Sequence, residues 1–119
     1  MAEKLNIVID QGATFPLYVE YKDPDGDPID LTGYSVRMQI RQSASAAAKL
    51  LDFDSADLDA GMTVEALDET GVIDLKLAPS VTSGLTFNAA EWDLVVESPD
   101  GIVTRLVQGK ASVSLGVTR

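Results

Sequence analysis

The sequence contains no cysteine and no histidine, and aromatic residues occupy only 6% of its 119 positions. Without cysteine the chain has no disulfide, thiol nucleophile, iron–sulfur cluster or thiolate zinc site, and without histidine it lacks the commonest general base and metal ligand. Serine and threonine are plentiful, but no Ser-x-x-Lys or Gly-x-Ser-x-Gly motif activates a hydroxyl group. We therefore predict a protein that is not an enzyme and uses no cofactor.

Basic residues are also scarce, because 9 Lys and Arg stand against 19 Asp and Glu, which gives a net charge of -10. Nucleic acids and anionic membranes repel such a chain as a whole, so we predict neither as a partner. No apolar run approaches the roughly 20 residues of a transmembrane helix, and residues 1–4 show no feature of a secretory signal. We expect a soluble protein that is synthesised in the cytosol.

The clearest pattern in the chain is the alternation of apolar and polar residues at positions 34–41. Successive side chains of a strand point to opposite faces, so Val36, Met38 and Ile40 line one face while Arg37 and Arg41 line the other. The segment is predicted to be a strand with one buried and one solvated face. Such strands are typical of antiparallel sheets.

Similar short segments between turn residues recur along the chain. We expect strands at residues 5–9, 14–22, 34–41, 49–53, 62–66, 72–77, 90–98, 102–107 and 111–117. Together they predict an all-β fold, a two-sheet antiparallel immunoglobulin-like sandwich, with a small barrel as the alternative. Residues 1–119 are predicted to form a single domain, with a loop or insertion near residues 42–60, where the alternation lapses.

Several local signals refine this prediction. Pro16 has no N–H for a ladder, so its strand is expected at a sheet edge or to begin pairing after that residue. Residues 78–85 predict one short helical turn between the two sheets, with Ser80 as its cap and Gly84 as its stop. Residues 99–101 predict a hairpin, and Trp92 is in phase with apolar neighbours and is expected in the core.

An acidic run at residues 23–30 raises the question of calcium, because Asp23, Asp25 and Asp27 alternate like the first ligands of an EF-hand, with Asp30 close by. The remainder of that motif is missing: its glycine position holds Pro28 and its bidentate glutamate position holds Tyr34. The pattern favours an acidic turn without an ion, and the four aspartates are the only metal candidates.

Three other groups of residues each have a functional and a structural interpretation. The acidic residues Asp52, Asp54, Asp57 and Asp59 are interpreted as a solvated loop, since nothing in the sequence shows them meeting at a pocket. The tyrosines at 18, 21 and 34 can mark a binding surface, although such residues more often fill cores. The face formed by Arg37, Gln39 and Arg41 can bind an acidic neighbour, or it can be a solvent-exposed sheet face without a binding function.

The run Asp25-Gly26-Asp27-Pro28-Ile29-Asp30-Leu31-Thr32-Gly33 between two strands resembles the "D-G-x-P-x-D-L-T-G" turn of small immunoglobulin-like proteins from the tails and baseplates of tailed bacteriophages and prophages. It resembles in particular the N-terminal domain type of upper baseplate proteins. Three other parts of the chain also resemble sequences of that family: residues 9–15, the alternating strand at 36–41 and the end of the chain.

This resemblance implies a non-enzymatic structural component of a virion, an adaptor or a hub or fibre attachment protein. Its implied partners are other tail or baseplate proteins, with homo-oligomer formation as a further expectation. Alternatives are an immunoglobulin-like adhesion module of a bacterial surface and a phage assembly chaperone that is absent from the mature particle.

Overall fold

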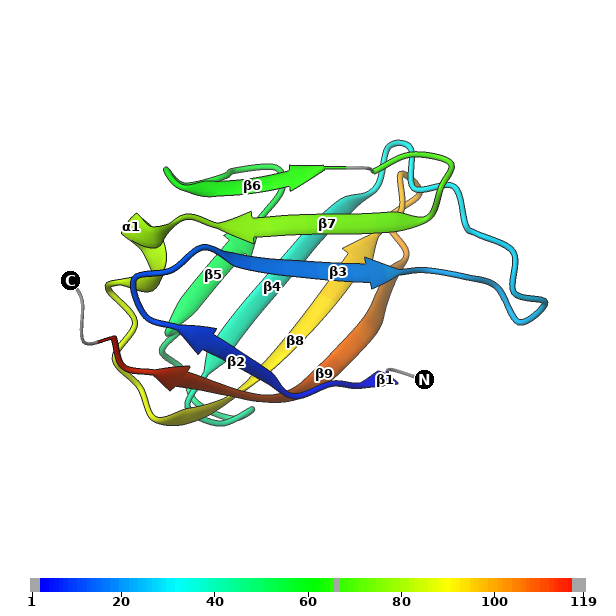
Figure 1. Cartoon of the computed structure of the whole chain (residues 1–119). Coiled ribbons are helices and arrows are strands. Elements are labelled where there is room, and N and C mark those ends of the chain that lie inside the picture. Colours follow the sequence, from blue (N-terminus) through cyan, green and yellow to red (C-terminus); the bar gives the residue numbers. More distant parts are fainter. Residues whose placement is uncertain (1–2, 66, 117–119) are drawn as a thin grey trace.

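The computed structural model describes residues 3–65 and 67–116, which form two β-sheets packed face to face (Figure 1). The larger sheet has the strand order β1-β9-β8-β4-β5, with β2 also paired to β9, and the smaller sheet has the order β3-β7-β6. The strands are β1 (Glu3–Lys4), β2 (Ile7–Asp10), β3 (Phe15–Glu20), β4 (Ser35–Arg41), β5 (Leu51–Asp54), β6 (Met62–Glu65), β7 (Val72–Leu77), β8 (Ala89–Glu97) and β9 (Val103–Ser114). The helix α1 (Pro79–Thr82) connects β7 of the smaller sheet to β8 of the larger one.

The apolar faces predicted from the alternation form the core. Val36, Met38 and Ile40 of β4 are completely buried, and Trp92 of β8 is only 3% exposed. One continuous cluster takes residues from all strands between β2 and β9. Burying a large aliphatic or aromatic side chain stabilises a fold by roughly 1.5–3 kcal/mol, so this cluster is the main source of stability.

The prediction of purely antiparallel sheets was wrong at one edge, where β1 and β2 both pair with β9 in parallel. The strand predicted at residues 5–9 begins only at Ile7, as β2, because residues 5–6 belong to no strand. There the backbone of Leu5 passes close to β9 at Gly109. A Cβ atom at Gly109 would lie only 2.0 Å from the carbonyl oxygen of Leu5, so no larger residue fits there. The indole N–H of Trp92 donates a hydrogen bond of 2.9 Å to the same oxygen.

The two last predicted strands, at residues 102–107 and 111–117, are one continuous strand, β9, which ends at Ser114. Its pairing with β8 shifts register between Leu94 and Val95, which leaves Leu106 as an extra residue on β9. Such a bulge increases the local twist and changes the phase of the alternation. Leu115, which the prediction placed within the strand at residues 111–117, lies beyond β9 and is 61% exposed.

Smaller predictions had mixed outcomes. Pro16 does lie in an edge strand, because β3 pairs only with β7 among the described strands. The N-cap of α1 is Ala78 and makes no side-chain hydrogen bond, so the assignment of Ser80 as cap was wrong. Parts of the predictions at residues 66 and 117–119 lie outside the described residues. In the described part of the chain, no helix is long and apolar enough to cross a membrane.

Candidate interaction surfaces

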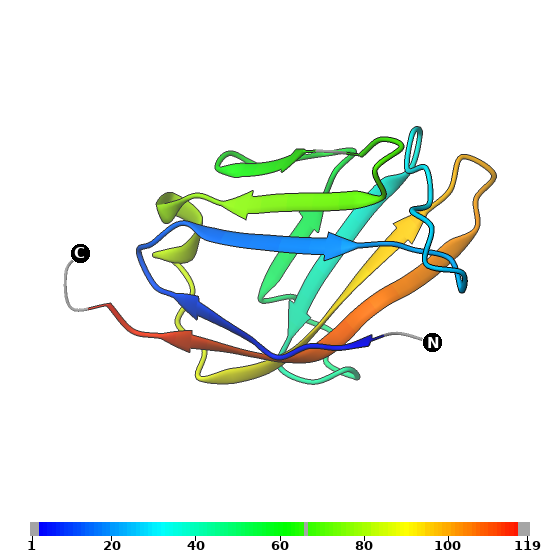
Figure 2. The same ribbon diagram turned by 45° about the vertical axis from the view of Figure 1, so that its right-hand side comes forward.

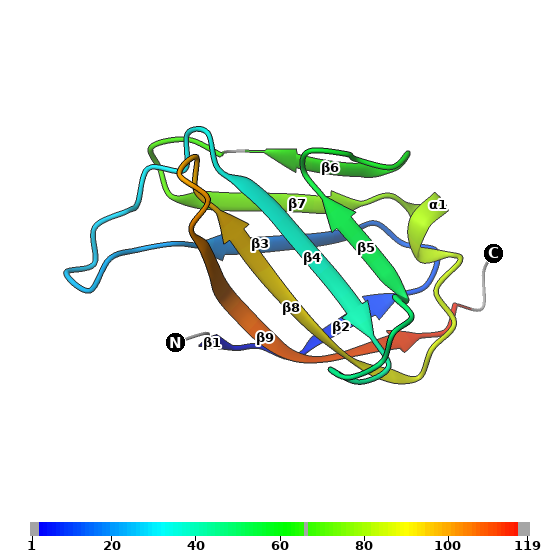
Figure 3. The same cartoon turned by 180° about the vertical axis from the view of Figure 1, so that it is seen from behind.

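The solvent-facing side of the larger sheet carries most of the basic side chains of the molecule. It is formed by β4, β5, β8 and β9, which lie at the front in Figure 3. The strand register aligns its outward residues in rows, for example Gln39 with Asp93 and Gln108, and Arg41 with Glu91 and Lys110. We call this surface the charged face. Its ionisable residues are Lys4, Arg37, Arg41, Lys49, Asp52, Asp54, Glu91, Asp93, Glu97, Arg105 and Lys110.

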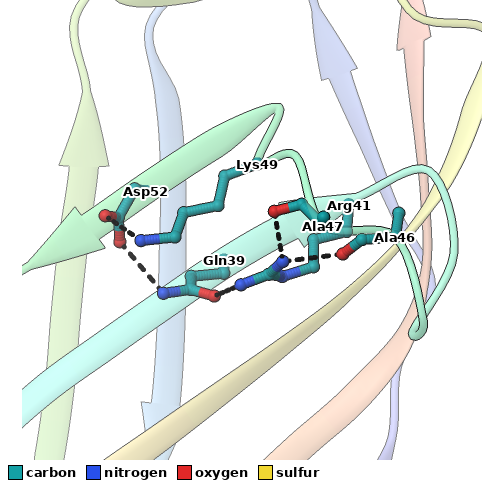
Figure 4. Close-up of polar contacts among 6 residues, drawn as sticks. All are labelled: Gln39, Arg41, Ala46, Ala47, Lys49 and Asp52. Carbon is teal, nitrogen blue, oxygen red and sulfur yellow. Dashed lines mark hydrogen bonds and ion pairs between the residues drawn. The ribbon is translucent and has the colours of Figure 1, made fainter.

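A network at one side of the charged face holds the loop between β4 and β5 (Figure 4). The guanidinium group of Arg41 donates hydrogen bonds to the carbonyl oxygens of Ala46 (2.7 Å) and Ala47 (2.9 Å), and to the Gln39 side chain. Gln39 in turn donates to a carboxylate oxygen of Asp52, which also pairs with Lys49 at 3.1 Å. Two of the three polar residues predicted from the alternation therefore hold the loop in place.

Glu91 fastens the same loop from the neighbouring strand. One carboxylate oxygen accepts a hydrogen bond from Lys110 (2.8 Å) and the other from the backbone N–H of Ala44 (2.8 Å). These two bonds, with the positive charge of Lys110, hold the pKa of Glu91 below its usual value. The predicted loop at residues 43–48 is thus hydrogen-bonded to both β4 and β8.

Two cations of the charged face make no hydrogen bond or ion pair with another described residue. They are the side chains of Lys4 and Arg37, whereas Arg105 pairs with Asp93 at 3.4 Å. Lys4 and Arg105 line a shallow groove of about 450 Å³ on the charged face. Free cations on an accessible sheet face are available to the carboxylates of a partner.

The charge of this face contrasts with the remainder of the molecule. Its six basic and five acidic residues make it slightly positive, and taking them from the totals of 9 and 19 leaves three basic and fourteen acidic residues elsewhere. The residues that β4 contributes to the charged face were predicted from the sequence. The residues from β8 and β9 were not: Glu91, Asp93, Arg105 and Lys110. The alternation in β8 gives a signal for Glu91 and Asp93, since these two acids alternate with the apolar residues Ala90, Trp92 and Leu94.

The opposite charge gathers in three loops at one end of the sandwich. These are residues 21–34, 67–71 and 98–102, and only the first projects far from the sheets (Figure 1). The backbone N–H of Leu31 donates to the carbonyl of Asp68 at 2.9 Å, and Gly33 lies against the ring of Pro99. Their acidic residues are Asp23, Asp25, Asp27, Asp30, Asp68, Glu69 and Asp100.

Two of the four carboxylates considered as calcium ligands, those of Asp23 and Asp30, accept hydrogen bonds from backbone amides in this structure. One oxygen of Asp23 accepts hydrogen bonds from the N–H groups of Asp25 and Asp27, both at 3.0 Å, and Asp30 accepts one from Thr32 at 2.9 Å. Within residues 3–65 and 67–116, no three acidic side chains gather closely enough to hold a metal ion. The hydrogen bonds with Thr32 lower the pKa of Asp30.

The remaining candidate residues have structural surroundings. Asp52 belongs to the Arg41 network, and Asp54 accepts a hydrogen bond from the backbone of Ala56. The other two acids of that cluster, Asp57 and Asp59, are exposed, as the solvated-loop interpretation expects. Tyr21 and Tyr34 pack partly against the core, whereas Tyr18 is 58% exposed.

Comparison with solved structures identifies immunoglobulin-like domains. The chain superposes on extracellular domains of the voltage-gated sodium channel beta4 subunit, described as parallel homodimers that explain its role in cell–cell adhesion, with a TM-score of 0.55, 12% identity and coverage of 98% of this chain and 96% of that one. A second structure, from photo-crosslinking work on cell-adhesive interactions of these beta subunits, gives 0.54, 12%, 93% and 92%. No family model and no curated protein matches the sequence.

These comparisons confirm the predicted fold class. The chain is an all-β, two-sheet immunoglobulin-like sandwich over nearly its whole length. At 12% identity the likeness concerns the fold alone, because many unrelated functions share this sandwich. The resemblance of residues 25–33 to phage tail and baseplate proteins stays a prediction.

Proposed function

We propose that this protein is a non-enzymatic protein–protein interaction module and a structural component of a phage or prophage virion, acting as an adaptor or attachment protein of the tail or baseplate. The observation that carries the interaction function is the separation of charge between the charged face and the acidic loops. Complementary charge selects and orients partners more than it adds affinity. Such a surface suits repeated, ordered contacts in an assembly.

The virion setting rests on the turn motif at residues 25–33 and on what its residues do. Gly26 has a φ of +88°, Asp30 binds the N–H of Thr32, and Leu31 is completely buried. Every one of these roles shapes the long loop between β3 and β4. These residues therefore have structural roles in the loop, and the proposal of a virion component rests on the resemblance of their sequence to tail and baseplate proteins.

An immunoglobulin-like adhesion module of a bacterial surface is the second candidate. The observation that favours it is the likeness to extracellular domains whose described role is cell–cell adhesion through homodimers. In that setting the partner is a second copy of the chain, and the protein lies outside the cell. An assembly chaperone would share the partners of a virion component but leave the finished particle.

Mass spectrometry of gradient-purified virions tests the proposal, using the phage or induced prophage that encodes the chain. We expect the protein at a fixed ratio to the major tail protein, with synthesis in the host cytoplasm before assembly. Absence from intact particles, together with recovery of the protein from assembling intermediates, would point to a chaperone. Absence from both, with surface labelling of uninfected cells, would support the adhesion module.

A further inference from the structure

The smaller sheet has an uncovered edge at β3. Among the described strands β3 pairs only with β7, because β1 and β2 both pair with β9 in the larger sheet. Figure 2 shows the separation of β3 from β1 and β9 at the end of the molecule where the chain begins. The edge therefore exposes backbone N–H and C=O groups that form no hydrogen bond with any described strand.

The register shows which backbone groups face outward. Tyr21 donates its N–H to the carbonyl of Gly71, in line with the β3–β7 pairing, so the odd-numbered residues of β3 bond to β7. The even-numbered residues Pro16, Tyr18 and Glu20 then direct their backbone groups away from β7. Pro16 has no N–H to offer, so the free donors are the N–H groups of Tyr18 and Glu20.

A groove of about 700 Å³ runs beside this edge. One wall is formed by residues 18–23 of β3 and the start of the following loop, and the other by residues 3–5 and 104–107 of β1 and β9. The groove begins beyond Pro16, where the free donors are. The groove is therefore an opening between the two sheets, and it lies next to the backbone groups of β3 that have no strand partner.

The lining of the groove indicates the chemistry of its occupant. Its apolar residues include Leu5, which is 41% exposed, together with Leu106 and Val107. Charged residues line it as well, but their charges balance, because the acidic Glu3, Glu20 and Asp23 stand against the basic Lys4, Lys22 and Arg105. A mixed groove without net charge suits an uncharged segment, and the free ladder suits only an extended backbone.

We propose that the β3 edge binds an extended, uncharged segment of a partner protein as a fourth strand of the smaller sheet. Every second side chain of that segment enters the groove against Leu5 and Leu106, while its backbone pairs with Tyr18 and Glu20. The groove adjoins the charged face at Lys4 and Arg105, which line both surfaces, but strand pairing at β3 goes beyond the function proposed above. A partner can therefore be held by two adjoining contacts, one specified by charge and one by strand pairing.

Hydrogen exchange measured by NMR tests this proposal, with a capped peptide of about seven alternating Thr and Val residues as the probe. At about 1 mM peptide we expect exchange of the Tyr18 and Glu20 amides to slow at least tenfold. The amides of Leu17 and Val19, which already face β7, serve as an internal reference. A peptide N-methylated at alternate residues should have no effect, because it cannot complete the ladder.

A pair of variants locates the site. Leu5→Glu places a charge in the groove wall and should weaken peptide binding at least tenfold, whereas Val8→Glu, on the same sheet edge but outside the groove, should not. Unchanged exchange at Tyr18 and Glu20, or equal protection by the methylated peptide, would overturn the proposal. Protection that rises with protein concentration alone would also overturn it, since the occupant would be a second copy. None of these results depends on finding the protein in virions.

Discussion

The hydroxyl group of Thr82 is a buried polar group that joins α1 to the first turn of the chain. It donates a hydrogen bond of 2.8 Å to the carbonyl of Ala13 and accepts one of 3.1 Å from the N–H of Gly12. The residue is completely buried. The turn before β3 is therefore fixed to the crossover between the two sheets by this side chain, together with Gln11, whose amide group donates to the carbonyl oxygens of Ser83 and Leu85.

Thr82→Val should lower the free energy of unfolding by about 1–3 kcal/mol, because it keeps the shape of the side chain but leaves two backbone groups without their partner. Thr63→Val, on the exposed side of β6, is the matched control and should change stability by no more than about 0.5 kcal/mol. Urea denaturation followed by tryptophan fluorescence measures both. Equal stability of the two variants would show that water replaces the hydroxyl group.

Gly109 is needed for the close crossing of β9 and the chain at Leu5. Gly109→Ala should cost at least about 3 kcal/mol, because the added methyl group meets backbone that has to move away from the sheet. Gly26→Ala is the comparison: its φ is +88° and nothing lies within 4 Å of an added Cβ, so only backbone strain of about 1–2 kcal/mol is expected. Thermal unfolding of the two variants tests this ranking, and a reversed order would contradict the crossing geometry.

At the scale of single elements, the loop between β3 and β4 depends on carboxylates that bind backbone amides. Because hydrogen bonds with Thr32 lower the pKa of Asp30 below 3.8 in the folded state, the unfolded chain binds this proton more readily. The contribution of Asp30 to stability is then fully present above about pH 4 and is lost as the pH falls through the lower, folded-state pKa. The same sign holds for Asp68, which binds Thr70.

Asp30→Ala should therefore destabilise the protein at pH 7, and the difference from the original chain should shrink below pH 3.8. Asp25→Ala is the control, since no described residue donates a hydrogen bond to that carboxylate. Denaturant titrations at pH 7, 5 and 2.5 give the comparison. A difference that grows towards low pH would have the wrong sign for this mechanism.

Individual strands could be predicted wherever one face is buried without interruption. The alternation of Val36, Met38 and Ile40 gave β4 within one residue, and the Asp-Gly signal at Asp100 placed the hairpin between β8 and β9. The continuity of β9 could not be predicted, because the extra residue at Leu106 changes the phase and Gly109 looks like part of a turn. Local patterns carry no information on a bulge that the neighbouring strand imposes.

Only part of the candidate interaction surfaces could be predicted from the sequence. Alternation located Arg37, Gln39 and Arg41 on one face, but their neighbours come from β8 and β9 through a register that is long-range. The parallel pairing of β2 with β9 was missed for the same reason, since turn signals concern only strands that follow each other. Pro16 did predict that β3 lies at a sheet edge, but not that β1 and β2 pair with β9 and leave that edge uncovered.

For the whole molecule, the separation of charge predicts how it meets a partner. Arg37→Glu should slow association with a partner of the charged face by about tenfold at low ionic strength, because it reverses a free cation on that face. Lys76→Glu changes the net charge equally but lies on β7 of the smaller sheet, so it should have little effect. Surface plasmon resonance at low and high salt distinguishes them, and equal effects would mean that net charge alone governs binding.

The pairing of β2 with β9 also sets the order in which the protein can become complete. Ile7 pairs with Ala111, so β2 leaves the ribosome well before its partner β9 has been made. Folds dominated by such distant contacts fold slowly, on the order of milliseconds to seconds. During synthesis the strands β3 to β8 can pair with one another, but β2 stays unpaired and β8 lacks its second neighbour until β9 arrives. Chains stopped before β9 are therefore the species most exposed to aggregation or capture by a chaperone.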